Sequence, residues 1–166
     1  FPGGYIRIYR NTSHGDTIAF ASPVDFSAGG GPIYSLAIGD LEGDGKPEIA
    51  AAVWSQSSVV VLHNNASVSV INGSSFSPVS TGPLSGGPYG VAIGDINGDG
   101  KNDLVVSQPQ YDIVSVLRNK ELSGGLTDTS FAGPVGFSVG TGPFRVKIGD
   151  VDVDGKLDIA SANFGV

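Results

Sequence analysis

Short apolar runs separated by turn residues recur along the whole chain. Each run is four to eight residues long, is rich in Val, Ile, Tyr and Phe, and is bounded by Gly, Pro, Asn or Asp, which is typical of β-strands. No window of eleven or more residues has the 3.6-residue period of an amphipathic helix. The 26 Gly and 10 Pro residues also disfavour long helices, because both destabilise a helix interior. The pattern predicts an all-β fold.

The runs belong to a repeat of about 55 residues. The tripeptide Ile-Gly-Asp occurs at 38–40, 93–95 and 148–150, with Gly-Pro a few residues before it and a second apolar run after it. A third run ends in Asn, at 5–11, 59–64 and 113–119, and a fourth is clearest at 20–26 and 131–137. Each repeat therefore predicts a four-stranded antiparallel meander. Such repeats must stack, and they are most often β-propeller blades.

The repeats divide the chain into a single array over residues 1–166. We expect the third and fourth strands of a split blade at 1–31, whole repeats at 32–87 and 88–142, and the first two strands of a split blade at 143–166. These add up to three blades, fewer than the four to eight of a closed propeller. We therefore expect the open strand edges to pair with other copies of the chain or with adjoining blades of a longer chain. Since Met is absent, we also expect a processed or partial chain.

A nine-residue acidic loop follows each Ile-Gly pair: loop 1 (40–48), loop 2 (95–103) and loop 3 (150–158). Acidic or amide side chains occupy positions 1, 3, 5 and 9, Gly occupies position 6, and Lys occupies position 7. Calcium needs six to eight oxygen ligands, and an EF-hand loop supplies them from positions 1, 3 and 5 and from the carbonyl at position 7, with Gly at position 6. The loops therefore predict calcium sites between strands.

The distribution of charge supports the prediction that the loops bind calcium. Eleven of the 16 acidic residues lie in the three loops, and three bound Ca²⁺ would change the formal net charge from −7 to −1. Asp-Gly and Asn-Gly also form hairpin turns that need no ion. A bare turn does not explain three or four mutually repelling carboxylates within nine residues, so calcium is favoured.

The motif Gly-Asp-x-[Asn/Asp/Glu]-x-Asp-Gly-x-x-[Asp/Glu], present three times in register, resembles the FG-GAP and VCBS repeats, the calcium-binding blades of integrin-α-like propellers. The resemblance covers essentially the whole chain. It implies a propeller, an extracellular location, one Ca²⁺ per loop, and a role in adhesion, in ligand recognition or beside a catalytic domain. The ligands that it implies are Asp40, Glu42, Asp44, Lys46 and Glu48; Asp95, Asn97, Asp99, Lys101 and Asp103; and Asp150, Asp152, Asp154, Lys156 and Asp158. The longer Glu side chains of loop 1, and Val153 where the other loops have Gly, predict less ideal geometry in loops 1 and 3.

Other candidate sites are weaker. Asn11, Asn65 and Asn72 begin Asn-x-Ser/Thr sequons, which also arise by chance and which predict glycosylated surface loops if the chain passes through a glycosylating pathway. For Trp54 and the five Tyr residues, packing between sheets is favoured over a sugar-binding platform. We expect His14 and His63 at the surface, and no catalytic triad from Ser13-His14-Gly15-Asp16, since sequence neighbours rarely form one.

The composition of the chain argues against several classes of site and of function. Without Cys there are no disulfides or thiolate sites, and the net charge of −7 argues against nucleic acid. The longest apolar run, 49–54, is far shorter than the roughly 20 residues of a membrane span, so no membrane insertion is expected. We predict a non-catalytic, extracellular calcium-binding protein. It is either a module that recognises a glycan or protein ligand or, as the alternative, a structural subunit of an extracellular assembly or fibre built by head-to-tail blade completion.

Overall fold

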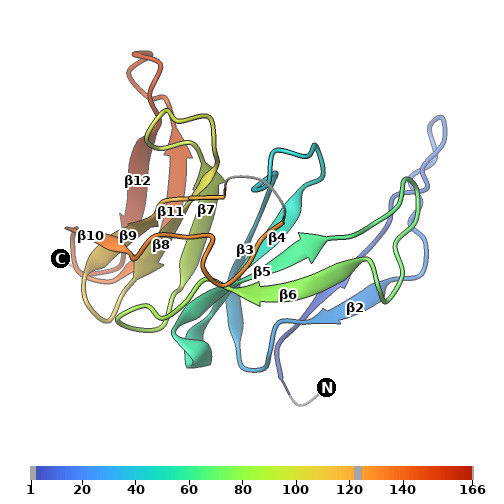
Figure 1. Cartoon of the computed structure of the whole chain (residues 1–166), viewed down its shortest axis with the longest axis horizontal. Helices are drawn as coiled ribbons and strands as arrows, with labels where there is room; N and C mark the ends of the chain where they lie inside the picture. Colours follow the sequence, from blue (N-terminus) through green and yellow to red (C-terminus); the bar gives the residue numbers. More distant parts are fainter. Residues whose placement is uncertain (1–2, 122–124, 166) are drawn as a thin grey trace.

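The computed structural model describes residues 3–121 and 125–165, in which the regular elements are β-strands and one 3₁₀ turn. The strands form four antiparallel sheets that follow one another along the chain (Figure 1). In order, the sheets are β1 (Tyr5–Ile8) with β2 (Val24–Ser27); β3 (Ile33–Gly39), β4 (Glu48–Val53), β5 (Ser58–Asn64) and β6 (Phe76–Ser80); β7 (Gly90–Gly94), β8 (Asp103–Gln108), β9 (Ile113–Leu117) and β10 (Val135–Ser138); and β11 (Pro143–Gly149) with β12 (Asp158–Asn163). The 3₁₀ turn η1 (Trp54–Gln56) joins β4 to β5. The predicted all-β fold of propeller-type blades is confirmed.

Both four-stranded sheets are meanders in which each strand pairs with the next one along the chain. The hairpins β3–β4, β7–β8 and β11–β12 share one register at the loop end: Gly39 pairs with Glu48, Gly94 with Asp103 and Gly149 with Asp158. Each acidic loop therefore leaves its hairpin at the same point. The three loops project to one side of the molecule, at the top of Figure 1.

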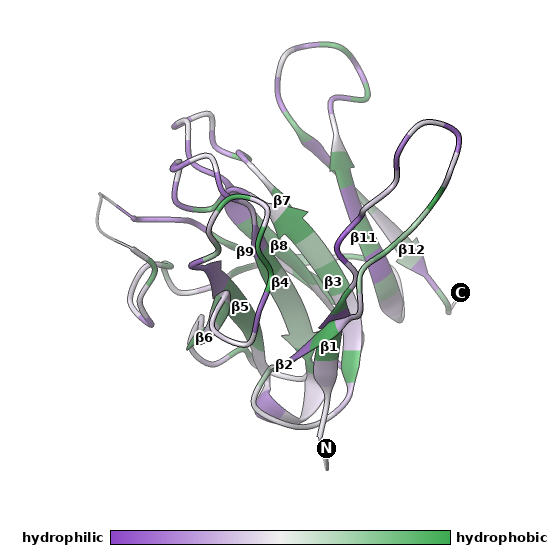
Figure 2. Cartoon of the chain, turned by 90° about the vertical axis from the view of Figure 1, so that its right-hand side faces the viewer, coloured by the Kyte–Doolittle hydropathy of each residue, from purple (hydrophilic) through white to green (hydrophobic). Residues whose placement is uncertain are grey.

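The core lies between successive sheets. Strands β4 and β8 are buried along their whole length, and the hydrophobic segments gather in the strands while the loops are mostly hydrophilic (Figure 2). Ala50, Ala52, Val59 and Val61 of the β3–β6 sheet form one cluster with Val91, Leu104 and Val106 of the next sheet. Similar clusters join β1–β2 to β4 and β5, and β11 to β7–β9. Each sheet is thus stabilised mainly by its neighbours.

A glycine–isoleucine contact repeats between successive blades. An added Cβ at Gly39 would lie 2.7 Å from Ile93 Cγ2, and one at Gly94 would collide with Ile148. Gly39 and Gly94 end the first strands of their sheets, and each isoleucine comes from the first strand of the following sheet. Glycine is required here because the backbone of one blade lies directly against a side chain of the next.

Aromatic rings bridge the blades at the start of the first strands. Tyr34, Tyr89 and Phe144 occupy equivalent positions; Tyr34 stacks on Tyr89 with ring centroids 4.2 Å apart, and Tyr89 meets Phe144 edge-on at 4.6 Å. Trp54 contacts both tyrosines edge-on and lies against Gly87, which ends the repeat of Trp54 just before β7. The prediction that Trp54 packs between sheets is confirmed.

We expect Gly39→Ala to lower the free energy of unfolding by about 1–3 kcal/mol, because the methyl group would overpack the contact with Ile93. Gly73→Ala is the matched control, since an added Cβ there meets no atom within 4 Å and its φ is not left-handed. Urea unfolding of the two variants measures the difference. Equal stability would contradict the close contact between blades.

Candidate metal centres

The acid at position 1 folds each loop around itself. In loop 2, Asp95 Oδ1 accepts hydrogen bonds from the amides of Gly98 (2.7 Å) and Asp99 (3.1 Å), and Oδ2 accepts one from Gly100 (2.8 Å). The bond to the glycine at position 6 recurs at 2.9 Å in loops 1 and 3. One carboxylate thus orients several backbone amides, which is the local reason why acid and glycine occur at this spacing.

The acids at positions 5 and 9 make equally regular bonds. The position 5 carboxylate accepts from the lysine amide at position 7, at 2.8, 3.0 and 2.8 Å in loops 1 to 3. The position 9 carboxylate accepts from the amide at position 2, at 2.8, 3.1 and 3.0 Å. All three loops therefore adopt one conformation. Because a carboxylate has about four lone-pair sites, acceptor capacity is left for a cation.

Carboxylate oxygens converge most clearly in loop 3. Asp150, Asp152 and Asp158 each place an oxygen within 4.8 Å of the others. Two oxygens bound to one Ca²⁺ at 2.3–2.6 Å lie within about 5 Å of each other, so these three acids are spaced as ligands of a single ion. In loop 2, position 3 is Asn97, whose side chain is neutral. Asn97 Oδ1 accepts a hydrogen bond from the backbone amide of Asp99 at 2.8 Å.

Two of the position 9 acids are fully buried. Glu48 and Asp103 have no exposed surface, and burial raises the pKa of both carboxyls. Glu48 Oε2 accepts from the Leu41 amide, but Glu48 Oε1 has no hydrogen-bond partner among the described residues. A buried, unpaired carboxylate oxygen is costly unless a proton or a cation compensates it. A hard divalent cation fits this donor set of oxygens.

Loop 1 differs at position 3. The longer side chain of Glu42 reaches beyond its loop, where Oε1 accepts from the Leu126 amide at 2.9 Å and lies 2.5 Å from His63 Nδ1. Ligand atoms of Glu42, Glu48 and His63 are grouped within 4.8 Å. His63, predicted at the surface, is half-buried: its side chain is 24% exposed and its Nδ1 is buried. The repeat pattern could not predict the contact of His63 with Glu42, because the equivalent residue of the next blade is Arg118.

The lysines at position 7 lie outside the group of carboxylates. Lys46 and Lys156 place their Nζ atoms 3.3 and 3.4 Å from the position 5 acids Asp44 and Asp154. Hydrogen bonding to the Lys46 amide, followed by the ammonium itself, lowers the pKa of Asp44. Such exposed ion pairs contribute little to stability, so the lysines do not replace a bound cation.

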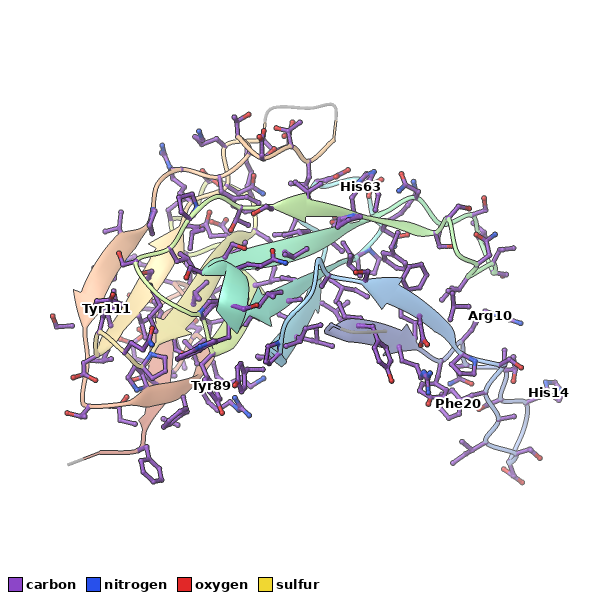
Figure 3. The ribbon with its side chains drawn as sticks, turned by 90° about the horizontal axis from the view of Figure 1, so that it is seen from below. Arg10, His14, Phe20, His63, Tyr89 and Tyr111 are labelled. Atoms are coloured by element: carbon purple, nitrogen blue, oxygen red, sulfur yellow. The ribbon has the colours of Figure 1, made fainter. Side chains whose placement is uncertain are left out.

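The remaining candidates lie apart from the loops. Asn11, Asn65 and Asn72 are exposed, Asn11 in an isolated β-bridge with Phe20 and the other two in irregular segments. His14 is at the tip of the hairpin that follows β1, far from His63 (Figure 3). Ser13 Oγ bonds to the backbone of Ala19 rather than to His14. Among the described residues, no hydrogen bond links the side chains of the Ser13–Asp16 segment.

Fold and loops together define a class, an all-β repeat protein of propeller type with one acidic loop per blade. In sequence, the FG-GAP repeat matches residues 87–129, and the FG-GAP-like repeat matches residues 2–51 and 50–106. The chain therefore belongs to the FG-GAP repeat family, whose members are typically extracellular and non-enzymatic. None of the curated proteins matches it. Loop 3 lies beyond the matched segments, and its sequence motif, its strand register and its hydrogen bonds equate it with loops 1 and 2.

Membrane-spanning helices are not part of the described fold: none of its helical segments has the length and hydrophobicity to cross a bilayer.

Val153 generates a prediction for loop 3. At position 4, Gly43 and Gly98 have φ values of 74° and 75°, and Val153 has a φ of 64°. This left-handed conformation is unfavourable for a β-branched residue. We expect Val153→Gly to stabilise the calcium-free protein by about 1 kcal/mol, since the relief of strain exceeds the entropic cost of glycine. The reverse change, Gly98→Val, should destabilise it by a similar amount in thermal unfolding.

Glu48 generates a prediction whose sign depends on calcium. Its pKa is raised, so ionisation costs stability at neutral pH when no cation is bound, and that cost disappears as the pH falls through the folded-state pKa. Glu48→Gln removes the charge and should raise the melting temperature of the calcium-free protein. The same variant should lower the melting temperature in excess calcium, because a ligand is lost. Shifts of the same sign in both conditions would contradict a metal-ligand role for Glu48.

Proposed function

We propose that this chain is a calcium-binding module of an extracellular adhesion or ligand-recognition protein and has no catalytic role. The observation that carries the proposal is one acid-lined loop conformation repeated three times. Calcium is the cation favoured by carboxylate, amide and carbonyl oxygens at this spacing, and extracellular modules bind it with dissociation constants of about 10⁻⁴–10⁻³ M.

The ion would be held by the side chains at positions 1, 3, 5 and 9 and by the lysine carbonyl at position 7. Bound calcium would neutralise the crowded carboxylates and fix the loop between the first two strands of a blade. Loop 1 also contacts the next blade, since Asn102 Nδ2 donates to the Asp40 carbonyl at 2.7 Å and Asn119 Nδ2 donates to the Leu41 carbonyl at 2.7 Å. Ordering loop 1 therefore supports the packing between blades as well.

The role in recognition is supported by the family and by the division of the molecule into two ends. FG-GAP repeats are found in adhesion and ligand-binding proteins. The calcium loops occupy one end of the blades, and the bridging aromatic rings lie near the other, where Tyr34 is 37% exposed and Phe164 is 86% exposed. A calcium-ordered scaffold would leave this second end available for a glycan or a protein ligand.

Binding to arrays of glycans and of extracellular proteins, with and without calcium, tests the role in recognition. The expected result is saturable binding that depends on calcium and that Tyr34→Ala or Phe164→Ala weakens. A structural role in an assembly is the alternative, which the exposed edges of β1 and β12 favour. Polymers seen by electron microscopy in calcium, together with no array binding, would favour that alternative.

Removal of calcium generates the fourth prediction. If each site has a dissociation constant of about 10⁻⁴ M, as extracellular modules have, millimolar calcium stabilises the fold by about 1.4 kcal/mol per occupied site. Excess EGTA should therefore lower the melting temperature by many degrees, and added Ca²⁺ should restore it. The same melting curve with and without EGTA would contradict calcium binding. Magnesium is the control ion, because it demands near-octahedral geometry and gives up its water reluctantly.

A further inference from the structure

An imidazole lies beside the carboxylates of loop 1. Ligand atoms of Glu42, Glu48 and His63 are within 4.8 Å of one another. Glu42 and Glu48 hold positions 3 and 9 of the loop, whereas His63 belongs to β5, the third strand of the same blade. Two atoms bound to one Zn²⁺ at about 2.0–2.2 Å lie at most about 4.4 Å apart. Small rotations of these three side chains would therefore place all of them on one ion.

The burial of Glu48 is an independent reason to expect a cation here. Glu48 is fully buried, and its Oε1 accepts no hydrogen bond from the described residues. In loop 2, the acid at the same position, Asp103, accepts from the Asn119 amide at 2.8 Å. The counterpart of that amide in loop 1, from Asn64, lies near Glu48 but does not have hydrogen-bond geometry to Oε1. A buried carboxylate oxygen without a donor is costly unless a cation or a proton compensates it.

The ring of His63 turns a buried nitrogen toward the same place. Its Nδ1 lies 2.5 Å from Glu42 Oε1, but this contact does not have hydrogen-bond geometry, and within residues 3–121 and 125–165 the nitrogen has no hydrogen-bond partner. A proton shared between His63 and Glu42 would still leave Glu48 Oε1 unpaired. A divalent cation between the three side chains would satisfy all of them, because neutral imidazole and carboxylate are both metal ligands.

Backbone amides already hold both carboxylates in place. The Leu41 amide donates to Glu48 Oε2 at 2.8 Å, and the Leu126 amide, from the next repeat, donates to Glu42 Oε1 at 2.9 Å. Hydrogen bonds of this kind orient metal-binding side chains. The side chains of Glu42 and His63 are only 9% and 24% exposed. The three ligands are therefore oriented, and largely removed from water, by two successive blades.

The donor atoms favour a transition-metal ion over calcium. Calcium takes oxygen ligands, whereas Zn²⁺ binds histidine nitrogen together with carboxylate oxygen and can keep water as a fourth ligand. Two carboxylates would also balance the charge of the ion. Loop 2 has Asn97 and Arg118 at the places of Glu42 and His63. Because a guanidinium is always charged and has no acceptor lone pair, loop 2 cannot form the same site.

We propose that Glu42, Glu48 and His63 form a zinc site in loop 1, while loops 2 and 3 bind calcium. The proposal builds on the proposed function, in which the loops hold divalent cations, and names a different ion for loop 1. With calcium alone, loop 1 would take Ca²⁺ through its oxygen ligands, and Zn²⁺ would displace it. Bound zinc would join loop 1 to β5 and, through the bond of Glu42 to Leu126, to the next repeat.

Equilibrium dialysis of the whole, metal-stripped chain against micromolar Zn²⁺ in millimolar Ca²⁺ tests the proposal. We expect one zinc and two calcium ions per chain. His63→Gln should weaken zinc binding about 100-fold or more, since even the loss of a partner outside the ligand shell costs about 10–100-fold. Glu42→Asp, which keeps the charge but shortens the side chain, should also weaken zinc binding. His14→Gln is the matched control, because His14 is the other histidine of the chain and lies at a hairpin tip far from His63 (Figure 3).

Nitrogen-15 NMR of the two histidines gives a readout that needs no variant. Zinc should shift the Nδ1 resonance of His63 and leave the resonances of His14 unchanged. A chain that binds no zinc, a His63→Gln variant that binds zinc like the wild type, or a shift at His14 alone would overturn the proposal. Calcium in loops 2 and 3 is counted in the same dialysis, so the loss of the zinc site is distinguishable from a failure of calcium binding.

Discussion

The concentration of negative charge in the loops is the constraint on which the rest of the structure depends. Each loop must hold three or four carboxylates, or carboxylates and an amide, within nine residues. Hydrogen bonds from the loop's own amides satisfy part of each acid, most regularly at positions 1, 5 and 9. They leave the net charge uncompensated, and at Glu48 they leave a buried oxygen without a donor. A cation is the simplest group that would compensate the charge and also bind the unpaired Glu48 oxygen.

Loop 1 also takes part in the contacts between blades. The amide groups of Asn102 and Asn119, which belong to the second whole blade, donate to carbonyls of loop 1. The same blades meet through small and β-branched side chains and through the contact of Gly39 with Ile93. As in other repeat proteins, stability then resides largely in the interfaces between neighbours. Disorder in loop 1 would therefore weaken both its own hairpin and the interface with the next blade.

Local features of the fold could be predicted from the sequence, and features that arise between repeats could not. Strands, hairpins and acidic loops follow from turn residues and alternation within about ten residues of chain, and the 55-residue period aligns them. Asp103 and Asp158 hold the same position in the repeat, yet Asp103 is buried and Asp158 is exposed. The difference depends on which strands lie next to each loop, and the loop sequence does not contain that information. His63 and the contact of Glu42 with Leu126 are also non-local, and no equivalent residue in another blade indicates them.

The number of calcium ions bound per chain tests the central claim most directly. Equilibrium dialysis of the metal-stripped chain against Ca²⁺ should give three ions per chain at saturation. Replacing the position 1 acid of loop 2, as in Asp95→Ala, should reduce this number to two and leave the other sites occupied. Binding of no calcium at millimolar concentration, or the same number of ions in the wild type and in Asp95→Ala, would contradict the assignment of the loops as metal centres.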